Sequence, residues 1–180
     1  MKGTVKEKLW TYEDYLKLED DKRYEIIKGR LMEMPAPSVS HQRIVGVIYK
    51  ILDKKVGDKG EVIISPVDVV LSNDVVVQPD VIVILTENKG IIGDRIYGSP
   101  DIVVEVVSPN SYTRDRYEKF KVYEEFKVKE YWILLPGEKT IEVWCLKRGK
   151  YILHSVASEK GEIESYVLKG LKVKVEEVFK

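Results

Sequence analysis

The segment from Asp101 to Leu135 most constrains the fold, because it predicts two apolar strands joined by one helix. Asp101–Val107 is almost entirely β-branched, which is typical of a strand buried on both faces of a sheet. Thr113 to about Lys127 predicts a helix, since its aromatic residues recur every three positions. Glu130–Leu135 predicts a second buried strand. A strand–helix–strand crossover predicts two parallel strands and a right-handed connection.

The rest of the chain predicts helices followed by a series of strands. The expected elements are a short helix over Thr11–Glu19, a strand or hairpin over Arg23–Met34, a helix capped by Ser38 or Ser40 and ending near Val56, strands over Val62–Ser65, Asp68–Leu71 and Val75–Leu85, a hairpin pairing Ile141–Leu146 with Tyr151–Val156, and a last strand over Tyr166–Phe179 that can finish in a helical turn. Pro79 lies inside the Val75–Leu85 run and indicates a bulge or an edge position there. This order predicts one domain of the α/β (α+β) class over residues 1–180.

Charge and cysteine content exclude several classes of protein. The 30 Lys and Arg residues balance 30 Asp and Glu residues, so no overall basic field points to nucleic acid, although a local basic face is compatible with this balance. Cys145 is the only cysteine, which excludes an internal disulfide and a cysteine-based zinc site. Met1–Trp10 lacks the apolar region of a signal peptide, and no run is long enough to span a bilayer. We expect a cytoplasmic protein without a membrane segment.

Two carboxylates lie in or beside apolar strands, where carboxylates are rare without a partner or a function. Glu105 shares a strand face with Val103 and Val107, and Asp80 follows Pro79 in the preceding strand. If the two strands are neighbours, the carboxylates meet at one end of the sheet. Bound Mg²⁺ or Mn²⁺ would relieve their repulsion, and without metal we expect one of them to have a raised pKa. The structural alternatives are a Pro-Asp turn at Asp80 and a buried ion pair at Glu105.

Lys119 is the third candidate, early on the helix that follows the Glu105 strand. It flanks the stripe marked by Phe120 and Tyr123, from which its ammonium group could reach the strand end. There it would orient an attacking water or neutralise a phosphorane. Its spacing alone favours a different interpretation, an exposed i,i+4 ion pair with Asp115.

Glu25 and His41 have simpler interpretations. For Glu25 we expect a salt bridge with Arg23 or Lys28 on an exposed strand face. For His41, in the first turn of its helix, we expect a half-buried side chain bonded to a backbone carbonyl rather than a ligand. Basic residues between positions 114 and 129 alternate with acidic ones, which indicates a solvated helix rather than a phosphate-binding surface. The sequence contains no Gly-rich phosphate loop, nucleophile triad or metal-binding histidine pair.

Several segments spread over nearly the whole chain match a known pattern. They are Tyr24–Gly29, Ser40-His41, Pro79-Asp80, Gly98–Pro109, Asp115 with Lys119 and Tyr123, Glu130–Ile133, Leu168–Leu171 and Val178-Phe179. Through them the chain resembles the Uma-type family of restriction-endonuclease-like proteins, most specifically between residues 98 and 132. The resemblance implies the PD-(D/E)XK nuclease fold, a central mixed sheet flanked by helices, here with a β-hairpin extension. It also implies metal-dependent hydrolysis of phosphodiester bonds.

The resemblance further implies roles for individual residues. Asp80 and Glu105 correspond to the metal-binding acidic residues, with Mg²⁺ or Mn²⁺ as cofactor. The general Glu-x-Lys motif is here Glu105-Val106-Val107, so the role of the strand lysine passes to Lys119, which completes the catalytic set. The implied neighbours of the site are Glu25, His41, Ser108 and Tyr123. The implied partners are nucleic acid, with DNA expected, and a second copy of the chain in a homodimer.

The leading hypothesis is therefore a Mg²⁺-dependent endonuclease. The main alternative is a catalytically weak or inactive module that keeps the fold and binds nucleic acid or a protein partner, which the balanced net charge slightly favours. A glycosidase would also use a carboxylate pair, but the lysine and the lack of an aromatic-lined sugar cleft in the pattern disfavour it.

Overall fold

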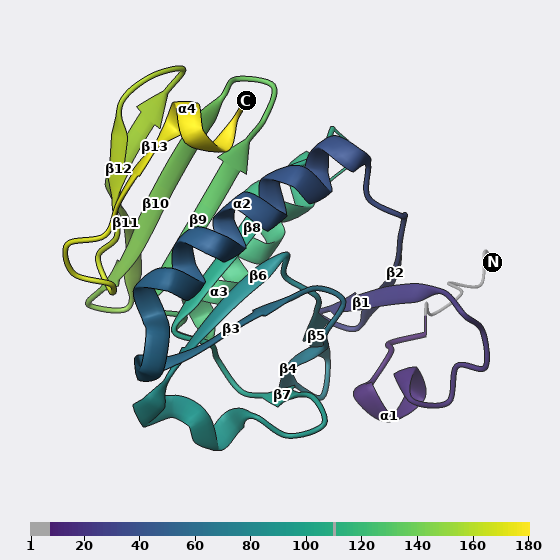
Figure 1. The fold of residues 1–180 in the computed structure, drawn as a ribbon. Helices are drawn as coiled ribbons and strands as arrows, with labels where there is room; N and C mark the ends of the chain where they lie inside the picture. Colours follow the sequence, from purple (N-terminus) through teal and green to yellow (C-terminus); the bar gives the residue numbers. More distant parts are fainter. Residues whose placement is uncertain (1–7, 110) are drawn as a thin grey trace.

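Helices and strands alternate irregularly along the structure, a computed structural model that describes residues 8–109 and 111–180 (Figure 1). The first half contains α1 (Tyr12–Tyr15), β1 (Arg23–Ile27), β2 (Arg30–Met34), α2 (Val39–Val56), η1 (Gly57–Lys59), β3 (Gly60–Ile64), β4 (Val69–Ser72), β5 (Val75–Val77) and β6 (Val81–Leu85). The second half contains η2 (Thr86–Ile91), β7 (Ile96–Tyr97), β8 (Ile102–Val106), η3 (Arg114–Lys119), α3 (Phe120–Glu125), β9 (Glu130–Leu135), β10 (Thr140–Lys147), β11 (Lys150–Ser158), β12 (Glu162–Glu164), β13 (Lys172–Lys174) and α4 (Val175–Val178). The elements η1 and η2 are 3₁₀ helices, whereas η3 is a π-helix.

Two mixed sheets form the framework. The larger has six strands in the order β11-β10-β9-β8-β6-β3, and the smaller has five in the order β2-β1-β5-β4-β7. In the larger sheet β8 and β9 are parallel, and every other neighbouring pair is antiparallel. The strands β12 and β13 form a small antiparallel sheet of their own. The central mixed sheet and the β10–β11 hairpin extension that we expected are therefore present.

The predicted crossover between residues 101 and 135 is confirmed, because parallel β8 and β9 flank a helical connection. Its helix differs from the prediction in one respect. Residues Arg114–Lys119 form a π-helix, and only Phe120–Glu125 continue as α-helix. An i→i+5 turn is rare and is not visible in an apolar periodicity.

Side chains of the larger sheet alternate between two apolar cores. Val81, Val104 and Trp132 face α2 and α4, whereas Ile82 and Val103 face α3 and the smaller sheet. The helices α2 and α3 thus cover opposite faces of the larger sheet, as Figure 1 shows. This explains why β6, β8 and β9 are apolar at nearly every position.

The predicted single strand over Val75–Leu85 is wrong. The run is divided into β5 and β6 by Gln78-Pro79-Asp80, and the two pieces belong to different sheets. Pro79 has no N–H to donate and therefore interrupts the ladder. Instead of a bulge, the chain passes from the smaller sheet to the larger one at this point.

Local capping signals place the helix starts. The side chains of Thr11 and Asp14 form a capping box, although α1 ends at Tyr15 rather than near Glu19. Ser38 caps α2 by accepting a hydrogen bond from the backbone N–H of His41. In the tail, the strand is confined to β13, and the helical turn expected at its end is present as α4.

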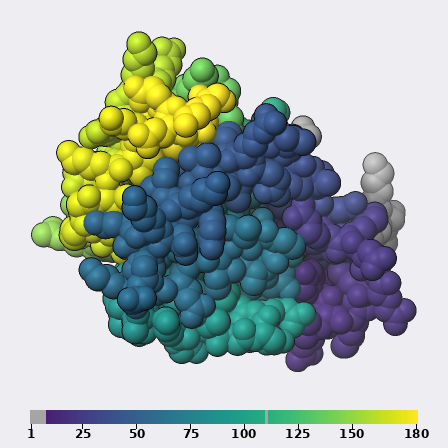
Figure 2. Space-filling view, in the orientation of Figure 1, coloured from purple at the N-terminus to yellow at the C-terminus, as the bar shows by residue number. Residues whose placement is uncertain are grey.

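The two ends of the described chain lie on opposite sides of the molecule. Figure 2 shows α2 crossing the surface between the N-terminal hairpin, in purple, and the C-terminal segment, in yellow. None of the helices in residues 8–109 and 111–180 is long and apolar enough to cross a membrane.

Candidate active site

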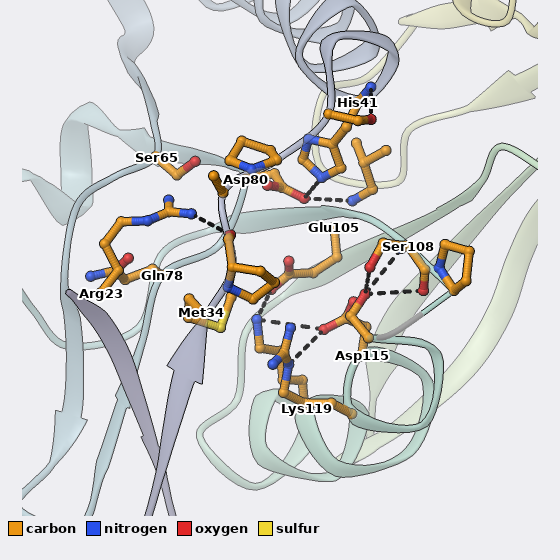
Figure 3. Close-up of a pocket in the computed structure, with 18 residues that line it drawn as sticks. Arg23, Met34, His41, Ser65, Gln78, Asp80, Glu105, Ser108, Asp115 and Lys119 are labelled. Carbon is orange, nitrogen blue, oxygen red and sulfur yellow. Dashed lines mark hydrogen bonds and ion pairs between the residues drawn. The ribbon is translucent and has the colours of Figure 1, made fainter.

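A pocket of about 280 Å³ opens at the point where the chain passes between the sheets (Figure 3). Its walls come from the open end of the β1–β2 hairpin, the start of α2, the Gln78–Asp80 segment, the end of β8 and η3. The titratable residues that line it are Arg23, His41, Asp80, Glu105, Arg114, Asp115 and Lys119. The strand switch thus gives both sheets access to one site.

Asp80 immediately precedes β6, and β6 is the neighbour of β8, which contains Glu105. In the antiparallel β6–β8 pair Val81 lies opposite Val104, which brings Asp80 beside the end of β8. Asp80 Oδ2 accepts a hydrogen bond of 2.7 Å from the backbone N–H of Val106. Both carboxylates line the same pocket.

Lys119 contacts Glu105 of this acidic pair. Its Nζ lies 2.8 Å from Glu105 Oε1 and 2.7 Å from Glu25 Oε1, whereas Asp115 Oδ1 is 3.6 Å away. The lysine side chain is only 1% exposed. The predicted i,i+4 ion pair with Asp115 is present, but it is buried rather than exposed, because η3 turns Lys119 inward to two closer carboxylates.

Glu25 is a buried member of the site, and its predicted exposed salt bridge with Arg23 or Lys28 is wrong. Its strand β1 lies between β2 and β5, so its position is internal to the smaller sheet. Glu25 Oε1 accepts a hydrogen bond from the backbone N–H of Gln78 at 2.8 Å, besides its contact with Lys119.

The other predicted neighbours lie around the same carboxylates. His41 is half-buried, as expected, and its Nε2 lies 3.3 Å from Asp80 Oδ2 (Figure 3). Its ion-pair partner is thus a carboxylate. Tyr123 is buried and donates its hydroxyl hydrogen to Glu105 Oε1 at 2.7 Å. Ser108 lines the pocket and donates to Ser111 Oγ at 3.0 Å.

Burial and charge together determine the protonation of the site. Burial raises the pKa of Glu105 well above its usual value, although the charge of Lys119 opposes this shift. Burial by itself would lower the pKa of Lys119, but Glu105, Glu25 and Asp115 outweigh it and raise that pKa above its usual value. Burial also raises the pKa of Asp115. Lys119 is therefore an ammonium ion at neutral pH. The expected raised pKa within the acidic pair is found at Glu105.

The oxygen atoms of the acidic pair suit a hard divalent cation. Within the described residues, Asp80 Oδ1 and Glu105 Oε2 accept no hydrogen bond, since the donors Val106, Lys119 and Tyr123 bond to the other oxygen of each carboxylate. Across residues 8–109 and 111–180, no group of three or more His, Cys, Asp or Glu side chains is arranged to hold a metal ion. Mg²⁺ commonly uses only one or two carboxylates and completes its shell with water and substrate phosphate. The donor set therefore fits Mg²⁺ or Mn²⁺.

The sequence did not identify two charged residues of the pocket. Arg114 and Asp115 both line it, although their segment was interpreted as a solvated helix. An α-helical periodicity would not place Arg114 and Lys119 together, because the π-helical turn changes which residues share a face. The only available signal was the position of Asp115 within the family-like pattern.

The fold is of the restriction-endonuclease-like class. The sequence model of the Uma2 family, described as "Putative restriction endonuclease", matches residues 12–176, and the chain belongs to this family. A crystal structure described as "a putative nuclease belonging to DUF820", from Anabaena variabilis, has a TM-score of 0.80 and 18% identity, and the match covers 94% of this chain and 97% of that one. This likeness establishes the shared fold.

A relative in Synechocystis sp., described as "Uncharacterized protein sll1609", is 24% identical over 176 residues. The match covers 90% of this chain and 96% of the relative. The two chains are thus similar over almost their full lengths. Membership of the Uma2 family supports a nuclease function.

Proposed function

We propose that the protein is a divalent-metal-dependent endonuclease that hydrolyses phosphodiester bonds in DNA. The observation that carries this proposal is the contact of Lys119 with Glu105, in the pocket that Asp80 also lines. The family description supports the reaction class. The second copy of a homodimer, implied by the family resemblance, is proposed with it.

In this proposal Asp80 and Glu105 hold the cation. Bound there, Mg²⁺ or Mn²⁺ supplies Lewis-acid activation of the phosphate and of water. Tyr123 and Lys119 orient the Glu105 carboxylate through Oε1, while the backbone N–H of Val106 orients Asp80. These contacts hold the ligands before substrate arrives.

Lys119 acts as a hydrogen-bond donor rather than a base. Its raised pKa keeps it protonated, so it has no lone pair with which to accept the proton of water. An ammonium ion in a buried site can orient the attacking water and stabilise negative charge on the phosphorane. During hydrolysis the water oxygen bonds to phosphorus and the proton of the water passes to solvent. The bond from phosphorus to the leaving oxygen breaks with its electron pair on that oxygen, which takes a proton from solvent.

The proposal is tested by incubating plasmid and single-stranded DNA with the protein in Mg²⁺ or Mn²⁺. We expect cleavage by the wild type and its loss in Asp80→Asn and Glu105→Gln, because both remove a negative ligand at nearly unchanged size. Lys121→Met, at an exposed position of α3, is the matched surface control and should cleave normally. Equal cleavage by all four proteins would identify a contaminating nuclease and overturn the proposal.

A non-catalytic nucleic-acid-binding module is the second candidate, and one observation favours it. The short contacts of Lys119 are all with carboxylates, so its ion pairs resemble a buried structural network. In that case DNA binding would depend on salt, would survive Asp80→Asn and Glu105→Gln, and would occur without cleavage.

A further inference from the structure

Arg114 is a second cation at the pocket, half-buried, and its guanidinium group is poorly paired. The side chain is 17% exposed and lines the pocket. Its Nε lies 3.5 Å from both Glu25 Oε2 and Asp115 Oδ1, and it has no hydrogen-bond partner although it is buried. A buried N–H group without an acceptor costs free energy, and such groups are uncommon in folded proteins.

The π-helical turn places Arg114 at this site. In an α-helix two residues five positions apart would point about 140° from one another. The i→i+5 turn of η3 stacks them, so that Arg114 and Lys119 contact the two oxygens of the same carboxylate, Glu25. A one-residue expansion of a helix is frequent at functional sites.

Another arginine on the same turn shows what an ordinary structural pairing looks like here. Arg116 Nη1 donates to Glu142 Oε2 at 2.7 Å, outside the pocket. Within the described residues, the carboxylate oxygens paired with Arg114 lie 3.5 Å from its Nε, so none is as close as Glu142 is to Arg116. Two of the three donors of the Lys119 ammonium group are directed to Glu25 and Glu105, which both lie within 2.8 Å of Nζ, so one donor remains for water. Arg114 therefore has donors left for a ligand besides the one that remains on Lys119.

We propose that Arg114 binds a phosphate oxygen of the phosphodiester backbone that enters the pocket. This inference rests on the proposed function and adds the residue that holds the substrate. The planar guanidinium group has five N–H donors and can bind two oxygens of one phosphate, which a lysine cannot do. Arg114 thus positions the phosphate, while Lys119 remains with its carboxylates.

The test measures binding in EDTA, where neither metal nor cleavage takes part. Fluorescently labelled single-stranded and duplex DNA are titrated by anisotropy at several KCl concentrations with the wild type, Arg114→Met, Arg114→Lys and Arg116→Met. We expect Arg114→Met to reduce the slope of log K against log salt by about 0.7 on single strands and about 0.9 on duplex. Arg116→Met removes the same charge from the same turn and should keep the wild-type slope.

Arg114→Lys retains the charge and the ion pairs with Glu25 and Asp115, so it separates folding from binding. We expect a folded variant, by far-UV circular dichroism, that keeps the slope but binds more weakly at every sequence. Wild-type affinity in Arg114→Lys, or an equal slope change in Arg114→Met and Arg116→Met, would overturn the inference. So would displacement of the DNA by inorganic phosphate at an equal concentration of phosphate groups, which would assign the site to free phosphate.

The two proposals fail in different ways. Suppose that Arg114→Met reduces the slope of log K against log salt, yet the wild type never cleaves DNA in Mg²⁺ or Mn²⁺. In that case the nuclease proposal is wrong and the phosphate site stands. If the wild type cleaves DNA and Arg114→Met binds with an unchanged slope, the phosphate site is wrong and the nuclease proposal stands.

Discussion

Lys119 stabilises the fold as well as the site, because it neutralises carboxylates from two different elements. Glu25 and Glu105 are both buried and both lie within hydrogen-bonding distance of its Nζ. In Lys119→Met two buried carboxylates lose their counter-charge. We expect the free energy of unfolding at neutral pH to fall by about 3–5 kcal/mol, as measured by urea denaturation.

The matched control is Lys121→Met, which removes a lysine from an exposed position two residues further on. Its free energy of unfolding should stay within about 0.5 kcal/mol of the wild type. Similar losses in the two variants would mean that the ion pairs of Lys119 contribute no more than surface charge.

Glu105 should make stability depend on pH in a defined direction. Its pKa is raised in the folded protein, so the folded state keeps a proton that the unfolded state has released. Stability then falls as pH rises from the unfolded value of about 4.5 through the folded pKa. We expect Glu105→Gln, studied in EDTA, to flatten this part of the curve of unfolding free energy against pH. Glu138→Gln, at an exposed turn position, should leave the curve unchanged, and a curve of Glu105→Gln that parallels the wild type would contradict the prediction.

At single positions the sequence predicted the residues that contrast with their own neighbours. Asp80 and Glu105 stand out because they interrupt apolar strands. Glu25 does not, since its burial depends on β5 and η3, which are distant in the chain. Tertiary contacts determine whether a polar side chain in a short amphipathic strand is buried and which partner it has. The local sequence pattern does not predict either.

At the scale of elements, the first turn of α2 holds His41 beside Asp80. Ser38 caps this turn through the backbone N–H of His41 at 3.2 Å. We expect Ser38→Ala to lower the free energy of unfolding by about 1 kcal/mol, and Ser38→Gly by only a few tenths of a kcal/mol, in urea denaturation. If Ser38→Ala is no less stable than Ser38→Gly, the cap does not stabilise the helix.

The π-helix η3 can be tested by removing one residue from it. Tyr117 is 57% exposed, and its deletion would convert the turn to α-helix while Lys119 stays attached to α3. In the α-helical turn Arg114 and Lys119 would be four positions apart, about 40° from one another, so they would still share a face. We expect the deletion to keep the salt dependence of DNA binding that Arg114→Met reduces, and to destabilise the protein less than Lys119→Met. Tyr117→Ala keeps the turn and should bind like the wild type; a salt dependence lost in the deletion but kept in Tyr117→Ala would mean that Arg114 needs the π-helical turn to reach the pocket.

Elements with a long regular pattern were predicted well, and those defined by a single residue were not. The apolar stripe of α2 and the β-branched run of β8 each carry their signal over many positions. The passage between sheets at Pro79 and the extra residue in η3 are one-residue events. A proline in an apolar run is compatible with a bulge, an edge or a break, and only the packing of two sheets decides among these.

For the whole molecule, divalent metal should act as a stabilising ligand. A cation that binds only the folded state raises the free energy of unfolding by about 2.7 kcal/mol at a concentration 100 times its Kd. We expect a Mg²⁺ or Mn²⁺ titration to raise the thermal midpoint of the wild type, but not those of Asp80→Asn and Glu105→Gln. Potassium chloride at matched ionic strength is the control, and an equal rise in all three proteins would contradict a site at these carboxylates.

The contact of Glu25 with Lys119 also has a consequence for synthesis on the ribosome. The strands β1, β2, β4 and β5 are all made before residue 119, yet the cation that neutralises Glu25 emerges only with η3. Until then the smaller sheet would have to bury Glu25 without its counter-charge. The N-terminal strands should therefore close only after Lys119 has been translated, so that completion of the smaller sheet and assembly of the acidic site occur as one late event.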